Sequence, residues 1–285
     1  MNENPRPFLK WAGGKGQLLP RLLAELPSNF GDYHEPFLGG GALFFALCRQ
    51  GRMAGRKIYL SDSNAELITT YKAIRDDVDG VIRRLEPLKY DEDKFYEVRA
   101  MNPAKLPPTG VAARMIYLNR TCFNGLYRVN KSGRFNTSWG WYTDPLICDE
   151  PNLRAVSAVL VGVDFRAGSF EATRSKAKAG DLVYLDPPYL PASATANFTS
   201  FTNLGFSIKD HEWLLQMFWD MAGIGAFILL SNSDNEWARE HYRLGSRIME
   251  VRARRSINSK GTSRGKVKEL LIASYPEDKQ SALAL

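Results

Sequence analysis

The sequence predicts a three-layer α/β fold built on a mostly parallel sheet, with a mainly helical subdomain inserted into it. Short, almost wholly apolar runs recur along the chain, as expected for strands that are buried on both faces of a sheet. Helical patterns separate several of these runs, and this alternation favours the three-layer arrangement. The alternation stops between residues 65 and 151, which predicts the insert, while residues 1–64 and 152–285 form the main domain.

The elements of the main domain are predicted from local patterns, taken in chain order. A short strand leads through three glycines into a helical run that begins at Ala42. Four apolar runs predict strands, at 57–60, 159–163, 182–185 and 226–230. From Asp210, apolar residues return at helical spacing and predict a helix with Asp210 as its N-cap. The last residues, 276–285, are expected to form a disordered tail.

The predicted insert has a composition of its own. It opens with charged, helix-prone sequence as far as residue 86, and a proline-rich stretch follows at 102–110. Residues 109–143 contain no aspartate or glutamate, but they hold five basic and seven aromatic residues. Arginine can read guanine in the major groove and aromatic rings can wedge into a base stack, so the segment favours contact with DNA.

The overall composition bounds the class of protein. The 285 residues are 44% hydrophobic and 24% charged, which is ordinary for a globular protein, and a net charge of +7 favours a polyanionic partner. The three cysteines and three histidines lack the spacing of a metal site, so we expect reduced thiols and no metal. Without a leader or a long apolar stretch, we expect a cytoplasmic protein that does not contact membranes. We also expect a monomer.

A glycine-rich turn and an acidic strand end predict a site for a nucleotide-like cofactor. The run Glu35-Pro36-Phe37-Leu38-Gly39-Gly40-Gly41 joins a strand to a helix, and its glycines allow the backbone to approach a ligand closely. Asp62 follows the next strand, where such folds bind a pair of ribose hydroxyls. The alternative is that Asp62 caps a helix beside Ser63 and Asn64.

The loop after the strand at 182–185 carries the predicted catalytic residues, Asp186, Pro187, Pro188 and Tyr189. It lies at the edge where α/β sheets place their active sites. The prolines lack backbone N–H groups and fix φ, so the loop leaves the sheet stiff and extended. The Asp186 carboxylate and the Pro187 carbonyl can each accept a hydrogen bond from a planar amine, on which Tyr189 can stack. The alternative is a proline-rich surface turn with a packed tyrosine.

A second basic segment lies near the C-terminus. Residues 252–268 include seven basic residues and no acidic one, among glycine, serine, threonine and asparagine. This composition suits phosphate contacts made by a loop. The alternative is a solvated charged face.

These motifs, in this order, resemble the Dam family of DNA adenine-N6 methyltransferases, with the alpha order of motifs, over nearly the whole chain. The segments that resemble the family are Phe8–Lys15, Glu35–Gly41, Tyr117–Arg120, Phe123–Arg128, Asp186–Tyr189, Ser193–Thr199, Arg254–Ile257 and Lys266–Leu271. The resemblance implies the Rossmann-like fold of S-adenosylmethionine-dependent methyltransferases, in which the insert at 65–151 recognises the DNA target. It also implies S-adenosylmethionine as cofactor, double-stranded DNA as partner, and adenine in GATC or a longer GAT-containing site as target.

The resemblance also implies roles for single residues. Cofactor contacts are implied for Trp11, Lys15, Glu35, Phe37, Gly39, Asp62, Phe165 and Asp186. Lys10 and Arg128 would read guanines, while Phe123 would intercalate near the flipped adenine with Asn124 and Leu126 beside it. Further implied DNA contacts are Arg120, Asn130, Ser193, Asn197 and Arg254.

One departure from the family and three alternatives stay open. Where the family often has a proline after the Phe-Asn of the recognition hairpin, this chain has Thr137, Ser138 and Trp139, which leaves the reading of the later bases undefined. The alternatives are a methyltransferase for cytosine N4 or RNA, a catalytically silent DNA-binding regulator and a nicotinamide dehydrogenase. An aspartate at 186, where cytosine enzymes more often have serine, argues against the cytosine target.

Overall fold

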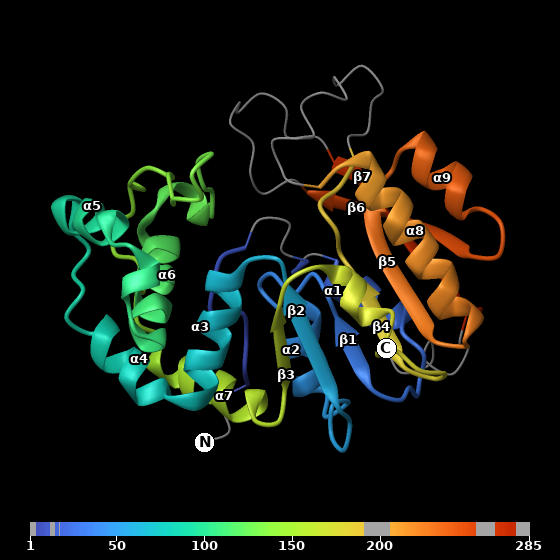
Figure 1. Ribbon diagram of the computed structural model, residues 1–285, viewed down its shortest axis with the longest axis horizontal. Helices are drawn as coiled ribbons and strands as arrows, with labels where there is room; N and C mark the ends of the chain where they lie inside the picture. Colours follow the sequence, from blue (N-terminus) through green and yellow to red (C-terminus); the bar gives the residue numbers. More distant parts are fainter. Residues whose placement is uncertain (1–3, 12–14, 17, 191–205, 255–265, 278–285) are drawn as a thin grey trace. The chain divides into compact units, whose positions relative to one another are not determined.

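A seven-stranded sheet is the framework of the fold (Figure 1). The computed structural model describes residues 4–11, 15–16, 18–190, 206–254 and 266–277. The strands are β1 (Tyr33–Glu35), β2 (Ile58–Asp62), β3 (Asp164–Ala167), β4 (Leu182–Leu185), β5 (Phe227–Ser233), β6 (Arg247–Arg254) and β7 (Lys266–Ala273). Their order in the sheet is β3-β2-β1-β4-β5-β7-β6. β1 pairs in parallel with β2 and β4, and β4 with β5, whereas β7 runs antiparallel to β5 and β6. The predicted Rossmann-like α/β fold on a mostly parallel sheet is thus confirmed.

The strand order reverses between β1 and β4. From β1 the chain continues to β2 on one side, whereas β4 is followed by β5 on the other. Open α/β sheets bind ligands beyond the carboxyl ends of the strands at such a reversal. The register places Tyr33 opposite Leu182 and His34 opposite Val183. Glu35 at the end of β1 and Asp186 directly after β4 therefore lie at the same edge of the sheet.

Packing divides the chain into two compact units. The helical unit comprises residues 1–15, 39–54 and 62–168, and the sheet unit comprises residues 16–38, 55–61 and 169–285. This division describes packing alone. The predicted functional division, with residues 65–151 as the part that recognises DNA, stays a prediction.

The helical unit is built around one buried helix. Its helices are α2 (Ala42–Arg49), α3 (Ala65–Asp76), α4 (Val78–Leu85), α5 (Glu92–Ala100), α6 (Pro108–Thr121) and α7 (Glu150–Leu160), with short 3-10 turns η1 (Pro103–Lys105) and η2 (Phe123–Gly125). α6 is buried on nearly all sides and contacts α3, α4 and α5. Its buried Arg114 pairs with Glu66 at 2.6 Å and donates to the carbonyls of Val98 and Arg99, so the buried charge is compensated.

The sheet unit has its core on one face of the sheet. It contains α1 (Leu19–Glu25), the 3-10 turn η3 (Phe170–Thr173), α8 (Ile208–Gly223) and α9 (Glu236–Tyr242). Apolar side chains of α8 and α9 form one buried cluster with side chains of β4, β5 and β7. The members from α8 recur at helical spacing, and they are Leu214, Met217, Phe218 and Met221. This core holds the carboxyl end of β4 firmly in place.

The predicted strand at 159–163 is wrong. The helix α7 extends through Leu160, and the strand β3 begins only at Asp164. A short apolar run does not distinguish a strand from a buried helix segment by itself. Leu153, Val156 and Leu160 are buried at helical spacing, and Pro151 suits the first turn of a helix.

Two further expectations need correction. Ser207, not Asp210, is the N-cap of α8, and Asp210 completes a capping box with it. Within the predicted basic loop, residues 252–254 and 266–268 lie in β6 and β7, while 255–265 lie outside the described residues.

Most of the predicted tail, 278–285, also lies outside the described residues. No helix among the described residues is both long and apolar enough to cross a membrane.

Candidate active site

The loop after β4 presents the four predicted catalytic residues in a defined environment. Asp186 and Tyr189 are half-buried, Pro187 is buried and Pro188 is exposed. The Tyr189 hydroxyl donates to Oε2 of Glu269 at 2.8 Å. Burial and the carboxylates of Asp186 and Glu269 raise the pKa of Tyr189 well above its usual value. The phenol therefore stays protonated, and its ring stays neutral, throughout the physiological pH range.

Residues that the sequence did not single out hold this loop. His211 donates a hydrogen bond to the carbonyl of Pro188, and the Ser233 hydroxyl donates to the carbonyl of Leu190. Glu269 lies within the segment 266–271, which carries part of the family resemblance, but the sequence does not distinguish it as a residue that holds the loop. One signal for Ser233 was present in the sequence, because polar residues follow the apolar run at 226–230 at the end of a buried strand.

The end of β1 adds an acidic group and an aromatic surface to the sheet unit. Glu35 is buried and accepts a hydrogen bond from the Tyr33 hydroxyl at 2.9 Å. Phe37 stacks on Phe170 with ring centroids 5.3 Å apart and meets the edge of Phe206 at 5.7 Å. A buried carboxylate beside an apolar aromatic wall suits a ligand that combines a cationic group with a flat ring.

In the helical unit, the glycine-rich turn is bonded to Asp62. Gly39 has a φ of +48°, and a Cβ at this position would lie 2.7 Å from Cδ1 of Trp11, so only glycine allows the indole to pack here. The Asp62 carboxylate accepts hydrogen bonds from the backbone N–H groups of Gly39 at 3.0 Å and Asn64 at 2.9 Å. Burial raises the pKa of Asp62. Asn64 is the N-cap of α3, so the alternative that Asp62 caps this helix is wrong.

Tyr71 links these residues to Phe165. Its hydroxyl donates to the Gly39 carbonyl at 3.1 Å, and its ring lies 5.6 Å from that of Phe165. Trp11 stacks on Tyr127 at 5.5 Å, and Lys15 is buried. Four predicted cofactor residues, Trp11, Gly39, Asp62 and Phe165, are therefore joined within one unit, while Glu35, Phe37 and Asp186 belong to the other.

The predicted DNA-contacting residues of the insert lie largely on an arm formed by residues 122–142. Isolated antiparallel bridges join Cys122 to Trp139 and Val129 to Phe135 across the arm. Phe123 is 47% exposed although it is large and apolar. The neighbouring Asn124 has a φ of +55°, an uncommon conformation for a residue other than glycine.

The two sides of the arm are joined by side chains. The Thr137 hydroxyl donates to the carbonyl of the half-buried Leu126 at 2.7 Å. Thr137, which stands where the family often has a proline, therefore has a structural role in the arm. Nε of the exposed Arg128 donates to Oδ1 of Asn136 at 2.9 Å. The Asn130 side chain accepts from the backbone N–H groups of Ser132 and Arg134 and organises the turn at the tip.

Two basic residues at the base of the arm are held by the protein. Oδ1 of Asn119 accepts from the Lys10 N–H, and Nδ2 of Asn119 donates to the Lys10 carbonyl, both at 2.7 Å. The Lys10 ammonium lies 4.3 Å above the ring of Tyr142, and burial and the nearby Arg120 lower its pKa. Arg120 is half-buried and donates to the Phe8 carbonyl at 2.8 Å. Asn119 belongs to the motif Tyr117–Arg120, but the sequence does not indicate that it holds Lys10.

Three predicted DNA-contacting residues have no described side chain. Ser193 and Asn197 lie outside the described residues, and Arg254 ends β6 without a described side chain. Among the residues that the structure does describe, no group of three or more histidine, cysteine, aspartate or glutamate side chains could hold a metal ion.

The fold is an open α/β sheet with a reversal of strand order, an architecture shared by many enzymes that bind nucleoside cofactors. A family model described as D12 class N6 adenine-specific DNA methyltransferase matches residues 11–257. The type II methyltransferase M.MjaIII of Methanocaldococcus jannaschii is 40% identical, over 95% of this chain and 99% of that protein. The type II methyltransferase M1.LlaDCHI of Lactococcus lactis subsp. cremoris is 38% identical, over 95% and 96%. A DNA adenine methylase of Serratia marcescens is 36% identical, over 93% and 97%.

The chain belongs to the D12 class of N6 adenine-specific DNA methyltransferases. The predicted enzyme class, the family resemblance and the DNA substrate are confirmed. The methyl donor of the family is S-adenosylmethionine, and the residues present fit it. Asp62 ends β2, where such folds bind ribose hydroxyls. The sheet unit holds the carboxyl groups of Glu35 and Asp186, and a carboxyl group suits a cofactor that carries a sulfonium and an ammonium group.

Proposed function

We propose that the chain methylates N6 of adenine in double-stranded DNA at GATC or a GAT-containing site, by base flipping and direct methyl transfer. The observation that carries the mechanism is the loop at 186–189, which leaves the reversal point of the sheet with one carboxylate and prolines without N–H groups. The family acts on adenine in DNA, so cytosine, RNA and nicotinamide substrates fall away. A catalytically silent regulator is the alternative that the experiment below tests.

The proposed role of the loop is to hold an aromatic amine. Its nitrogen lone pair is delocalised into the ring, so the amine must be turned before it can attack. The Asp186 carboxylate and the Pro187 carbonyl accept the two N6–H hydrogen bonds, and the Tyr189 ring stacks on the base. Stacking contributes about 1–3 kcal/mol per base, which offsets much of the few kcal/mol that flipping costs.

S-adenosylmethionine supplies a methyl group that its sulfonium already activates, so positioning rather than acid–base catalysis governs the rate. Asp186 is therefore an orienting acceptor rather than a strong base, and the reaction requires no metal. We assign Trp11, Lys15, Glu35, Phe37, Gly39, Asp62, Phe165 and Asp186 to the cofactor. Asp62 binds the ribose hydroxyls, while Phe37 and Phe165 line the pocket.

Target recognition is assigned to residues 65–151, and catalysis to residues 1–64 and 152–285. Lys10 and Arg128 read guanines, and the exposed Phe123 enters the base stack beside the flipped adenine. The Arg128 guanidinium is hydrogen-bonded to Asn136. This bond favours the reading role, because an arginine side chain that is held in place loses less entropy on binding. The remaining DNA contacts are assigned to Arg120, Asn124, Leu126, Asn130, Ser193, Asn197 and Arg254. We expect a monomer that works in the cytoplasm at the nucleoid.

Mapping of methylated adenines tests this proposal. Cells without adenine methylation express the chain, and their DNA is sequenced by a method that detects N6-methyladenine. We expect methylation at GATC or at longer sites that begin with GAT, and none when Asp186→Ala is expressed to the same level. A different motif would refute the proposed site, and DNA binding without methylation would support the silent regulator.

A further inference from the structure

The catalytic loop, residues 186–190, has few means of fixing its own backbone. Pro187 and Pro188 have no N–H to donate, so their peptide units can be anchored only through carbonyl oxygens and side chains. Within the described residues, three separate elements each supply such an anchor. His211 of α8 donates to the Pro188 carbonyl, Ser233 of β5 donates to the Leu190 carbonyl, and the Tyr189 hydroxyl donates to Glu269 of β7.

The anchor Glu269 belongs to the best-braced part of the sheet unit. It lies near the middle of β7, where the register pairs it with Ser233 of β5 and with Val251 of β6. Its backbone is therefore held from both sides, and its carboxylate reaches Tyr189 at 2.8 Å. A charge-assisted hydrogen bond of this kind is about twice as strong as a neutral one. The phenol ring is thereby fixed at its far end, which a stacking contact alone would not achieve.

The anchor His211 is also rigidly placed. It is buried in the first turn of α8, and its ring meets the edges of Phe206 at 4.8 Å and Trp237 at 6.0 Å. Asp210 stands beside it in sequence and belongs to the capping box of the helix. The imidazole is therefore packed between two aromatic rings while it donates to the Pro188 carbonyl.

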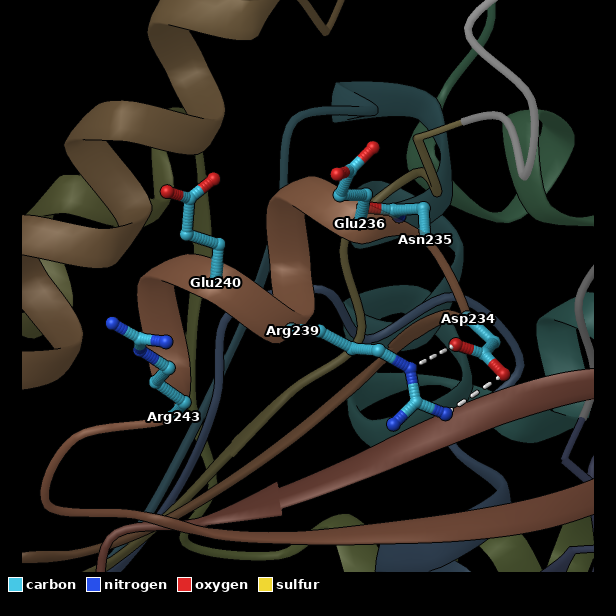
Figure 2. A pocket seen from close by; sticks show the side chains of 6 residues that line it. All are labelled: Asp234, Asn235, Glu236, Arg239, Glu240 and Arg243. Carbon is cyan, nitrogen blue, oxygen red and sulfur yellow. Dashed lines mark hydrogen bonds and ion pairs between the residues drawn. The ribbon is translucent and has the colours of Figure 1, made fainter.

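The third anchor, Ser233, is braced by the start of α9. Nδ2 of Asn235 donates to the Ser233 carbonyl at 3.2 Å and to its hydroxyl oxygen at 3.0 Å, while Oδ1 of Asn235 caps α9. Next to it lies a groove of about 630 Å³, in which Arg239 turns toward Asp234 (Figure 2). Arg239 makes two hydrogen bonds to Asp234, at 2.6 and 3.0 Å, and pairs with Glu250. This guanidinium ties the turn after β5 to α9 and β6.

We propose that Glu269 and His211 are positioning residues for methyl transfer, which fix the Tyr189 ring and the Pro188 carbonyl. They thereby hold the loop whose Asp186 carboxylate and Pro187 carbonyl are the two acceptors of the target amine. The inference rests on the proposed function, because it assigns these residues to the same reaction. Both act through the loop rather than on the base. Their loss should lower the rate of the methyl-transfer step and leave the binding of cofactor and DNA largely unchanged.

A double-mutant cycle tests the role of Glu269. The single-turnover rate of methyl transfer is measured on a short duplex with one GATC site, for the wild type, Glu269→Ala, Tyr189→Phe and the combination of both. We expect Glu269→Ala to lower the rate about tenfold, which corresponds to about 1.4 kcal/mol. In the Tyr189→Phe background, Glu269→Ala should lower the rate less than about twofold, because the hydroxyl that Glu269 holds is already absent. Glu269→Gln keeps an acceptor and should retain most of the rate.

His211 is tested by a pair of substitutions that differ in one donor. His211→Gln retains an N–H group that can reach a carbonyl, and His211→Leu fills a similar volume without one. We expect His211→Leu to lower the single-turnover rate about tenfold and His211→Gln to restore it to within about threefold. The Michaelis constant for S-adenosylmethionine and the dissociation constant for DNA should stay within about twofold in both.

Each outcome is decisive. The inference is overturned if Glu269→Ala costs the same factor with and without the Tyr189 hydroxyl, or if neither Glu269→Ala nor His211→Leu slows methyl transfer. Melting temperatures show whether each variant is folded. If Glu269→Ala does not fold, the rates of Glu269→Gln, His211→Leu and His211→Gln test the inference in its place. A wild-type chain that forms no N6-methyladenine would refute the proposed function itself, whereas an active wild type with unaffected variants would refute only this inference.

Discussion

The backbone N–H of Gly39 donates to the Asp62 carboxylate over 3.0 Å, and this bond ties the glycine-rich turn to the end of β2. The bond fixes the carboxylate but leaves it able to accept further hydrogen bonds, because each oxygen can accept more than one. Gly39 is in turn held by Tyr71, whose hydroxyl donates to its carbonyl. The carboxylate that we propose to bind the ribose is thus held in place by the protein itself.

Asp62→Ala should raise the Michaelis constant for S-adenosylmethionine by roughly ten- to a hundredfold, since hydrogen bonds to a charged group contribute about 1.5–3 kcal/mol. DNA affinity should not change, and Asp93→Ala, which removes an exposed aspartate in the same unit, is the matched control. Steady-state kinetics with titrated cofactor measures the effect. An unchanged Michaelis constant would remove Asp62 from the cofactor site.

The same carboxylate predicts a dependence on pH. Burial raises the pKa of Asp62, so it takes up a proton at a higher pH than an exposed aspartate does. Protonation removes an acceptor for the ribose hydroxyls. The Michaelis constant for the cofactor should therefore rise as the pH falls, and this acid limb should be absent from Asp62→Asn. A limb of equal size in Asp62→Asn would assign it to another group.

Asp186→Ala should abolish methyl transfer, to below about 1% of the wild-type rate, because the amine loses the acceptor that orients it. The duplex should still be retained, since the basic and aromatic residues of the arm are untouched. Formation of N6-methyladenine and binding to a labelled duplex are measured side by side. Methylation near the wild-type rate would refute the proposed mechanism.

Arg128→Ala should relax the choice of base at one position of the site, by about 1–3 kcal/mol of discrimination. The control is Arg134→Ala, which removes another exposed arginine of the same arm. Arg134→Ala should weaken binding to all duplexes alike and lower the salt slope by about 0.9. Rates on a set of duplexes with single base-pair substitutions distinguish the two. Equal discrimination in both variants would contradict a reading role for Arg128.

His211 should make the stability of the fold sensitive to acid. Burial lowers its pKa to about 4, with Asp210 acting in the opposite direction, whereas the unfolded chain titrates near 6.5. The unfolded state then binds more protons than the native state between these values, so stability falls as the pH falls from about 6.5 to 4. The loss amounts to about 3 kcal/mol. The free energy of unfolding, measured with urea, should fall by this amount more in the wild type than in His211→Gln between about pH 6.5 and 4. An equal dependence on pH in both proteins would contradict this role of His211.

Two elements that were predicted from neighbouring residues in the sequence are confirmed. Asp186 was placed at the end of a buried strand because the apolar run at 182–185 precedes it directly, and β4 confirms this. The helix that begins at Ala42 was likewise predicted from a pattern within one turn of its start. The run at 159–163 was misassigned because its five residues fit a strand as well as the end of a helix.

The sequence by itself determined the family and the α/β class, and it predicts the loop that we propose to carry the chemistry, because each depends on residues that are neighbours along the chain. Only the tertiary structure decided what holds that loop. Glu269 is separated from Tyr189 by eighty positions, and nothing in the local pattern of either residue indicates their hydrogen bond. His211 and Ser233 reach the same loop from a helix and a strand that the core packs together. Such contacts arise from the pairing of strands and the burial of helix faces, and these bring together residues that lie far apart in the chain.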